Sequence, residues 1–150
     1  MKFNHHWILA LLVAMCLPIS ACQKAQDVAE EEGKSPAEVK RLNGEDGPAQ
    51  ITLSEEASKR LDVQTAAVEE ADVNGAKQKS VPYAALLYDT TGATWVYTNP
   101  QQDTFIREAI KVDRIEGDKV VLAQGPAVAT KVVTVGVAEL YGSEQEFEEE

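Results

Sequence analysis

The chain has 150 residues, of which 44% are hydrophobic, and its 25 acidic and 14 basic side chains give a formal net charge of −11. An acidic protein of this kind repels the phosphates of nucleic acids and of anionic membrane surfaces. The composition therefore argues against nucleic acid as a partner.

The N-terminal segment has the order of a bacterial export signal. "MKFNHHW" carries a lysine, "ILALLVAMCL" is apolar, and "ISA" ends on a small residue, which is the order of charged region, apolar region and cleavage site. The alternative is a transmembrane anchor. The apolar run from Trp7 to Leu17 is too short for it, because a spanning helix needs roughly twenty residues, and Pro18 interrupts the run. The segment is thus predicted to direct export.

The residues around the cleavage site specify the kind of export. "I-S-A-C" resembles the lipobox of bacterial lipoproteins, in which the cysteine thiol receives the lipid and becomes the first residue after cleavage. We therefore expect residues 1–21 to be a lipoprotein signal peptide and Cys22 to be the lipid attachment site. Cys16 would be removed with the signal, which leaves no pair of thiols for a disulfide.

Residues 22–49 are polar, contain few branched apolar side chains, and have no aromatic ones. This composition predicts a tether. Within it, "SPAEVKRLNG" offers Ser35 as a helix N-cap, Pro36 at the first helical position, and Gly44 as a stop. One short helix is predicted there. An irregular spacer is the alternative, since short isolated helices are marginal in water.

The segment 50–143 is predicted to be the folded domain. Ser54 is a candidate N-cap, with Glu55 and Glu56 in the first turn, so a short helix should follow it. Asn74-Gly75 is a turn signal. Before that turn, a period of two places four side chains on one face of a strand: Leu61, Val63, Thr65 and Ala67.

Five later segments are rich in branched and aromatic residues: "VPYAALLYD", "ATWVYTN", "TFIREAIKV", "KVVLAQ" and "KVVTVGV". Short strands separated by regular turn signals are typical of small all-β domains. We therefore predict a mainly β fold, a small antiparallel β-barrel or sandwich of about five or six strands with one or two short helices. Pro82 is expected at the start of a strand, where no ladder N–H is required.

Two further features have simple interpretations. Residues 144–150 are predicted to be a solvated acidic tail, in which Phe147 is the one large apolar residue.

Trp95 and Tyr97 lie on the same face of a predicted strand. They are expected to be part of the core, and a recognition platform is the alternative.

The inventory of reactive side chains argues against an enzyme. Once the signal is removed, no histidine and no free thiol remain, so the usual zinc and copper sites and the Ser-His-Asp or Cys-His nucleophiles have no ligands or bases. We expect no catalytic residues, no metal site and no cofactor. A hydrolase that uses two carboxylates is the weakest alternative, because acidic residues are too plentiful for any pair to be informative.

The domain resembles the membrane-proximal part of periplasmic adaptor subunits, or membrane fusion proteins, of RND-type efflux pumps. That family shows V-P-x-x-A-V, G-x-x-W-V-Y, F-x-R-x-x-V, G-D-x-V-x-I and G-L-x-x-G-D-x-V-V in order. The resemblance covers about residues 51 to 141. Matching positions are Val81, Pro82, Ala85, Leu86, Gly92, Trp95, Val96, Tyr97, Phe105, Arg107, Ile110, Gly117, Asp118, Val120, Leu122, Val132, Val133, Gly136 and Leu140.

The chain also departs from the family. Adaptors insert a lipoyl-like domain, a helical hairpin and a β-barrel between the two halves of this domain, whereas only "ADVNGAKQKS" separates them here. Pro126 and Ala129 replace a Leu and a Gly of the last motif. If the turn requires a positive φ, Ala129 would cost about 1 kcal/mol there.

The resemblance implies a lipid-anchored periplasmic protein of a Gram-negative bacterium that acts by binding protein. Its expected partner is an RND pump subunit or a full-length adaptor. The alternative is a lipoprotein that binds a small ligand or a cell-envelope polysaccharide through its sheet. Gln23 is not the aspartate that retains enterobacterial lipoproteins at the inner membrane, which favours the outer membrane. Lipidated adaptors of the family usually sit on the inner one.

Overall fold

The computed structural model describes residues 35–42, 47–73 and 75–149, all within a compact unit that spans Gly33–Glu150. The predicted signal peptide and Cys22 lie outside the described residues. In the part that is described, no helix is both long and apolar enough to cross a membrane.

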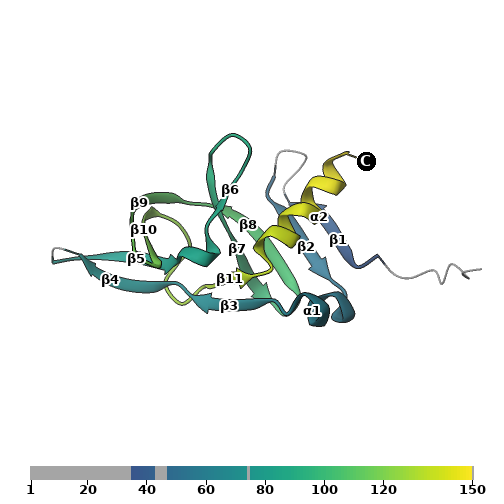
Figure 1. The fold of residues 1–150 in the computed structure, drawn as a ribbon, viewed down its shortest axis with the longest axis horizontal. Coiled ribbons are helices and arrows are strands. Elements are labelled where there is room, and N and C mark those ends of the chain that lie inside the picture. The colour runs from purple at the N-terminus through teal and green to yellow at the C-terminus, as the bar shows by residue number, and fades with distance from the viewer. Residues whose placement is uncertain (1–34, 43–46, 74, 150) are drawn as a thin grey trace, which may run out of the picture. The chain divides into compact units, whose positions relative to one another are not determined.

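The described residues form two antiparallel sheets, and the larger has seven strands (Figure 1). Its order is β1-β2-β8-β7-β11-β3, and the short strand β6 also pairs with β7. The strand bounds are β1 (Ala37–Arg41), β2 (Ala49–Leu53), β3 (Gln64–Ala67), β6 (Leu87–Tyr88), β7 (Thr94–Gln101), β8 (Thr104–Ala109) and β11 (Lys131–Val135).

The smaller sheet has four strands in the order β4-β5-β10-β9. Its strands are β4 (Glu69–Val73), β5 (Ala76–Pro82), β9 (Lys111–Glu116) and β10 (Lys119–Gln124). Two nearly continuous segments pass from one sheet to the other. β3 leads into β4 through Val68, and β8 leads into β9 through Ile110, and both of these corner residues are buried. The two sheets are therefore joined at these two corners.

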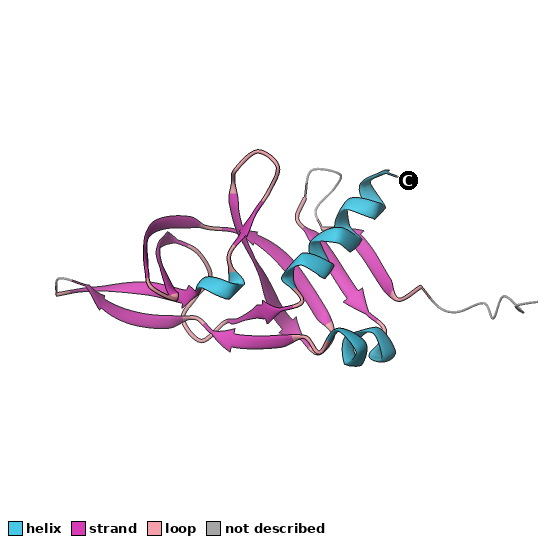
Figure 2. Cartoon of the chain, viewed as in Figure 1, coloured by secondary structure: helices cyan, strands magenta, loops and turns pink. Residues whose placement is uncertain are grey.

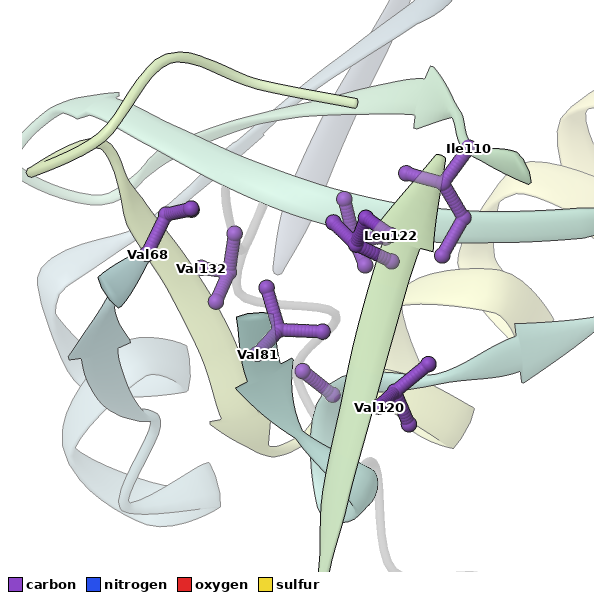
Figure 3. Close-up of a cluster of buried hydrophobic side chains, with 8 residues drawn as sticks. Val68, Val81, Ile110, Val120, Leu122 and Val132 are labelled. Carbon is purple, nitrogen blue, oxygen red and sulfur yellow. The ribbon is translucent and has the colours of Figure 1, made fainter. Parts of the chain in front are cut away.

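One core lies between the two sheets (Figure 3). Val81, Val120 and Leu122 contribute from the smaller sheet, and Val96 and Val132 from the larger. Ala85 and the corner residues Val68 and Ile110 complete the cluster, whose labelled side chains point toward one another in the figure. The hydrophobic pattern in β7, β10 and β11 thus serves to hold the sheets together.

A second core lies on the other face of the larger sheet. Successive residues of one strand point to opposite faces, so Tyr97 and Val133 join Ile51, Phe105 and Leu140 in this cluster, whereas their neighbours Val96 and Val132 belong to the first. Two helices, α1 (Glu55–Leu61) and α2 (Val137–Glu149), contribute to this core (Figure 2). The larger sheet is therefore covered on both faces.

The predicted fold class is confirmed: the chain is mainly β with antiparallel sheets and two helices. The described residues form no closed barrel, and their arrangement is compatible with a sandwich. The predicted number of strands was too small, since the described residues contain eleven. The segment "TFIREAIKV", predicted as one strand, bends at Ile110 and contributes to two. "ADVNGAKQKS", read as a connection, contributes the hairpin β4-β5.

Several local predictions are confirmed. Ser54 caps α1, and its hydroxyl accepts a hydrogen bond from the Ala57 N–H at 3.2 Å. Val73 pairs with Ala76 in the β4-β5 hairpin, and Gly75 has φ +80°, as the predicted turn requires, while Asn74 lies outside the described residues. Ala129 has φ +69°, so the turn does require the left-handed conformation that its sequence position suggested.

Other local predictions were wrong. Pro82 ends β5 rather than starting a strand, and a 3₁₀ helix, η2 (Tyr83–Ala85), follows it. Leu61, Val63, Thr65 and Ala67 do not share one face. Leu61 and Val63 point inward as predicted, but beyond them Ala66 and Val68 are the inward residues, and Thr65 and Ala67 are exposed. A register shift between β11 and β3 at Val133 and Val135 accounts for the change of phase.

The two ends of the domain also differ from expectation. "SPAEVKRLNG" contains strand β1 instead of a helix, because pairing with β2 and burial of alternate side chains outweigh weak local helix signals. The sheet thus begins inside the segment 22–49 that was assigned to the tether. Glu144 of the predicted solvated tail is fully buried on α2, because two arginines and a tyrosine surround its carboxylate.

Candidate functional site

The most chemically distinctive group of side chains lies where α2 crosses the larger sheet. Tyr97 on β7 is the register partner of Arg107 on β8, so both point to the α2 face. Arg41 on β1 is the register partner of the fully buried Ala49, which has only a methyl side chain. The small residue leaves room between the two arginines for a carboxylate, which Glu144 supplies from α2.

The carboxylate of Glu144 connects three strands to the helix. Its Oε2 accepts a hydrogen bond from the Tyr97 hydroxyl at 2.8 Å. Its Oε1 lies 3.0 Å from a terminal nitrogen of Arg107 and 3.4 Å from one of Arg41. A buried charge with this many partners is stable in place, whereas removing one partner of such a pair is strongly destabilising.

Burial raises the pKa of the Tyr97 hydroxyl well above its ordinary value. The negative charge of Glu144 and the hydrogen bond to Glu144 raise this pKa further. Tyr97 therefore remains a neutral donor over the physiological pH range.

Arg107 is also stacked between two aromatic rings. Its guanidinium carbon lies 4.5 Å from the centre of the Trp95 ring and 6.0 Å from that of Tyr141. The delocalised guanidinium suits both stacking and ion pairing. Its buried Nε has no hydrogen-bond partner among the described residues. Trp95 is therefore not simply a core residue. It is half-buried, whereas Tyr97 is buried as predicted.

The other end of Trp95 is fixed by the loop between β6 and β7. Its indole N–H donates to Asp89 Oδ2 at 2.9 Å, while Asp89 Oδ1 accepts from the Thr91 N–H, the Thr91 hydroxyl and the Ala93 N–H at 2.7 to 2.9 Å. The hydrogen bonds from Thr91 and Trp95 lower the pKa of Asp89 to about 2. Trp95 is thus held in one orientation by Asp89 and Arg107.

An open hollow of about 490 Å³ lies beside these groups. Trp95 and Arg107 line it together with Glu108, Ala109, Arg41 and the Gly47-Pro48 segment. Burial raises the pKa of the Glu108 carboxyl, and the nearby Lys79 ammonium offsets part of the rise. A larger hollow of about 740 Å³ beside Asn99 and Lys131 has no aromatic or acidic side chain. The hollow at Trp95 is therefore the better candidate for recognition.

The charged side chains of this group are engaged with one another. Among the described residues, no three of His, Cys, Asp and Glu gather closely enough to hold a metal ion. The buried carboxylate of Glu144 binds two arginines and a tyrosine. The chemistry that these side chains offer is recognition: an aromatic edge and guanidinium groups beside an open surface.

Sequence reasoning missed most of this site. It named Trp95 and Tyr97, but it used Arg107 only as a match to a family pattern and placed Arg41 and Glu144 in a tether and a tail. One signal was present. Val137, Leu140, Tyr141 and Glu144 follow the spacing i, i+3, i+4, i+7 of a buried helical face, so a carboxylate at the last position indicates a buried charge with a partner.

Neither a protein-family model, nor a curated protein, nor a solved structure matches the chain.

Proposed function

We propose that the protein is a lipid-anchored periplasmic protein that binds another protein without catalysis, as an accessory subunit of an efflux system. The observation that carries the binding role is the hollow lined by Trp95 and Arg107. Tryptophan and arginine are the residue types most enriched where binding energy concentrates in protein interfaces. Both side chains are held rigidly, so little conformational entropy is lost when a partner binds.

The partner is proposed from the resemblance, as an RND pump subunit or a full-length adaptor. The geometry is compatible with an accessory role. Where full adaptors carry a long helical hairpin toward the outer-membrane channel, the described chain has only the short β4-β5 hairpin between Val68 and Val81. We therefore expect the protein to bind through the face of its domain and not to replace a full adaptor.

Site-specific photocrosslinking tests this proposal. A photoreactive residue at Ala109, which is exposed on the rim of the hollow, should capture a pump or adaptor subunit in cells. Ala109→Trp should reduce capture from a second rim position, Pro48, by filling the hollow, whereas Ala127→Trp, on the exposed loop before β11, should not. Equal capture in both variants would show that the hollow is not the binding surface.

A drug-susceptibility test addresses the efflux role. The protein should fail to restore resistance in a strain that lacks a full adaptor, because it has no helical hairpin in its described part. Restored resistance, or capture of an outer-membrane channel alone, would contradict the proposal. Capture of a glycan with no protein partner would instead support the alternative of a polysaccharide-binding lipoprotein, for which the half-buried Trp95 is the relevant side chain.

The anchor is tested separately. Cys22→Ser should abolish metabolic lipid labelling and leave an uncleaved precursor, because the thiol is the atom that is modified. Cys16→Ser is the matched control and should be processed normally. Normal labelling of the Cys22→Ser protein would exclude this residue as the anchor.

A further inference from the structure

Strand β1 lies at one end of the larger sheet, beside α2 (Figure 1). It pairs only with β2 among the strands that the structure describes. An edge strand of this kind presents a row of backbone donors and acceptors to any further strand. Its side chains then determine which strand fits.

The hydrogen bonds to β2 show which residues of β1 face its open edge. The Ser54 N–H donates to the Pro36 carbonyl at 2.9 Å, and the Leu42 N–H donates to the Pro48 carbonyl at 3.0 Å. Successive residues of an antiparallel strand direct their backbone N–H and C=O groups to opposite sides. The backbone groups of the even-numbered residues of β1 therefore bond to β2. Val39 in the centre, with Ala37 and Arg41 on either side, directs its backbone groups outward.

The side chains of β1 divide between the two faces. Val39 faces α2 and lines a hollow of about 220 Å³ with Ala37 and Phe147, whose side chain is 43% exposed. Glu38 and Lys40 point to the opposite face, where their charged groups lie 3.5 Å apart and are mostly exposed. The edge therefore carries one positive and one negative charge, placed symmetrically about Val39.

We propose that β1 pairs antiparallel with β1 of a second copy of this chain, with the two-fold axis at Val39. In this register the outward backbone groups of Val39 meet those of its counterpart, and Ala37 meets Arg41. The hydroxyl of Ser35 donates to the Ala37 carbonyl at 2.6 Å, but a carbonyl oxygen accepts two hydrogen bonds. The interface is self-complementary, as a two-fold contact requires.

The charges select this register over its neighbours. With Val39 opposite Val39, each Glu38 faces a Lys40 on the other copy, so two pairs of opposite charge form. A shift of two residues in one direction places Glu38 opposite Glu38, and a shift in the other direction places Lys40 opposite Lys40. Like charges directly opposite each other destabilise a strand pair. A shift of one residue is excluded because outward-facing groups would no longer meet.

Charge exchange on the full chain, purified in detergent at physiological ionic strength, tests the proposal. The wild-type protein should sediment as a dimer at about 100 μM, a concentration at which contacts with micromolar Kd are populated. Glu38→Lys and Lys40→Glu should each be monomeric, because each places like charges opposite each other. An equimolar mixture of the two variants should form a heterodimer, since all facing pairs are then of opposite sign.

Two further variants separate pairing from folding. Glu38→Lys combined with Lys40→Glu should restore the homodimer. Val39→Pro should prevent it without breaking the β1–β2 ladder, because proline removes an N–H that points outward. Lys59→Glu, on the exposed face of α1, is the control and should leave the mass unchanged. A monomeric wild-type protein, a dimer unaffected by Glu38→Lys, or capture of a different protein that Val39→Pro abolishes while the wild type is monomeric would each overturn the proposal.

Discussion

The Tyr97 hydroxyl donates a hydrogen bond of 2.8 Å to the Glu144 carboxylate, and both side chains are fully buried. The two residues lie on β7 and α2, far apart in the sequence, so this contact fixes the helix over the sheet. Arg107 joins them by its ion pair with Glu144 and by its stacking on Trp95. Helix docking and the shape of the hollow are thus controlled by one network.

Glu144→Gln should lower the free energy of unfolding by about 3 kcal/mol, because it leaves two arginines without their carboxylate in a site with little solvent. Arg107 has a side chain only 14% exposed, so water compensates little for the loss. Chemical denaturation of the full chain measures the change. Glu146→Gln, on an exposed position of the same helix, is the control for loss of one charge and should change stability by less than about 0.5 kcal/mol.

Alkaline pH should destabilise the domain through Tyr97. The folded protein holds the pKa of this hydroxyl above its ordinary value, whereas in the unfolded chain it ionises near pH 10. The contribution to stability is therefore fully present below about pH 10 and is lost as the pH rises beyond it. The tyrosinate absorbance that Tyr97→Phe removes should appear together with unfolding. If that absorbance appeared while near-ultraviolet circular dichroism was still native, the hydroxyl would not be buried in this network.

Strands β7, β8, β10 and β11 could be predicted because their own residues are rich in branched and aromatic side chains. The β4-β5 hairpin could not, since its segment contains few such residues. The N-cap at Ser54 and the turn signal at Asn74-Gly75 could also be identified from the sequence, since capping and tight turns depend on a few neighbouring residues. Strand β1 could not be predicted from its own residues. Val39 is the one branched residue of "AEVKR", and only its pairing with Ile51 of β2 makes this segment a strand.

The candidate site was less predictable than the fold, for the same reason. Arg41, Arg107 and Glu144 are charged residues that would each be placed at the surface by composition alone. Glu144 is buried and the two arginines are partly buried because the topology brings them together from β1, β8 and α2. A buried ion cluster is a property of the assembled sheet and helix, and single segments do not encode it.

Ala129→Gly should stabilise the protein by about 0.5 to 1 kcal/mol. Ala129 has φ +69°, a conformation that costs a residue with a Cβ roughly 1–2 kcal/mol, and the greater freedom of glycine in the unfolded chain offsets part of the gain. The hydrogen bond from the Ala129 N–H to the Val68 carbonyl, at 2.9 Å, does not involve the side chain and should persist. Ala127→Gly, in the same loop without a positive φ, should destabilise. Lower stability of the Ala129→Gly protein would show that the methyl group has a packing role.

Asp89 should make the orientation of Trp95 sensitive to acid. Its pKa in the folded protein is about 2, below the value of about 3.9 in an unfolded chain. The stability that it contributes is therefore present above about pH 3.9 and is lost as the pH falls through about 2. Trp95 fluorescence should change with a midpoint near pH 2. The measurement uses the processed protein, because removal of residues 1–21 takes away Trp7, the other tryptophan.

Asp89→Asn gives the matched comparison for this acid transition. The asparagine oxygen can still accept from the loop N–H groups, but its amide nitrogen cannot accept from the Trp95 indole N–H, which now lies 2.9 Å from Asp89 Oδ2. We expect the variant to show an altered Trp95 spectrum at neutral pH and no transition near pH 2. A Thr90→Ala protein, changed at an exposed neighbour, should retain the wild-type transition. An unchanged transition in the Asp89→Asn protein would mean that another carboxylate reports through Trp95, and the role assigned to the Asp89 hydrogen bond would then be wrong.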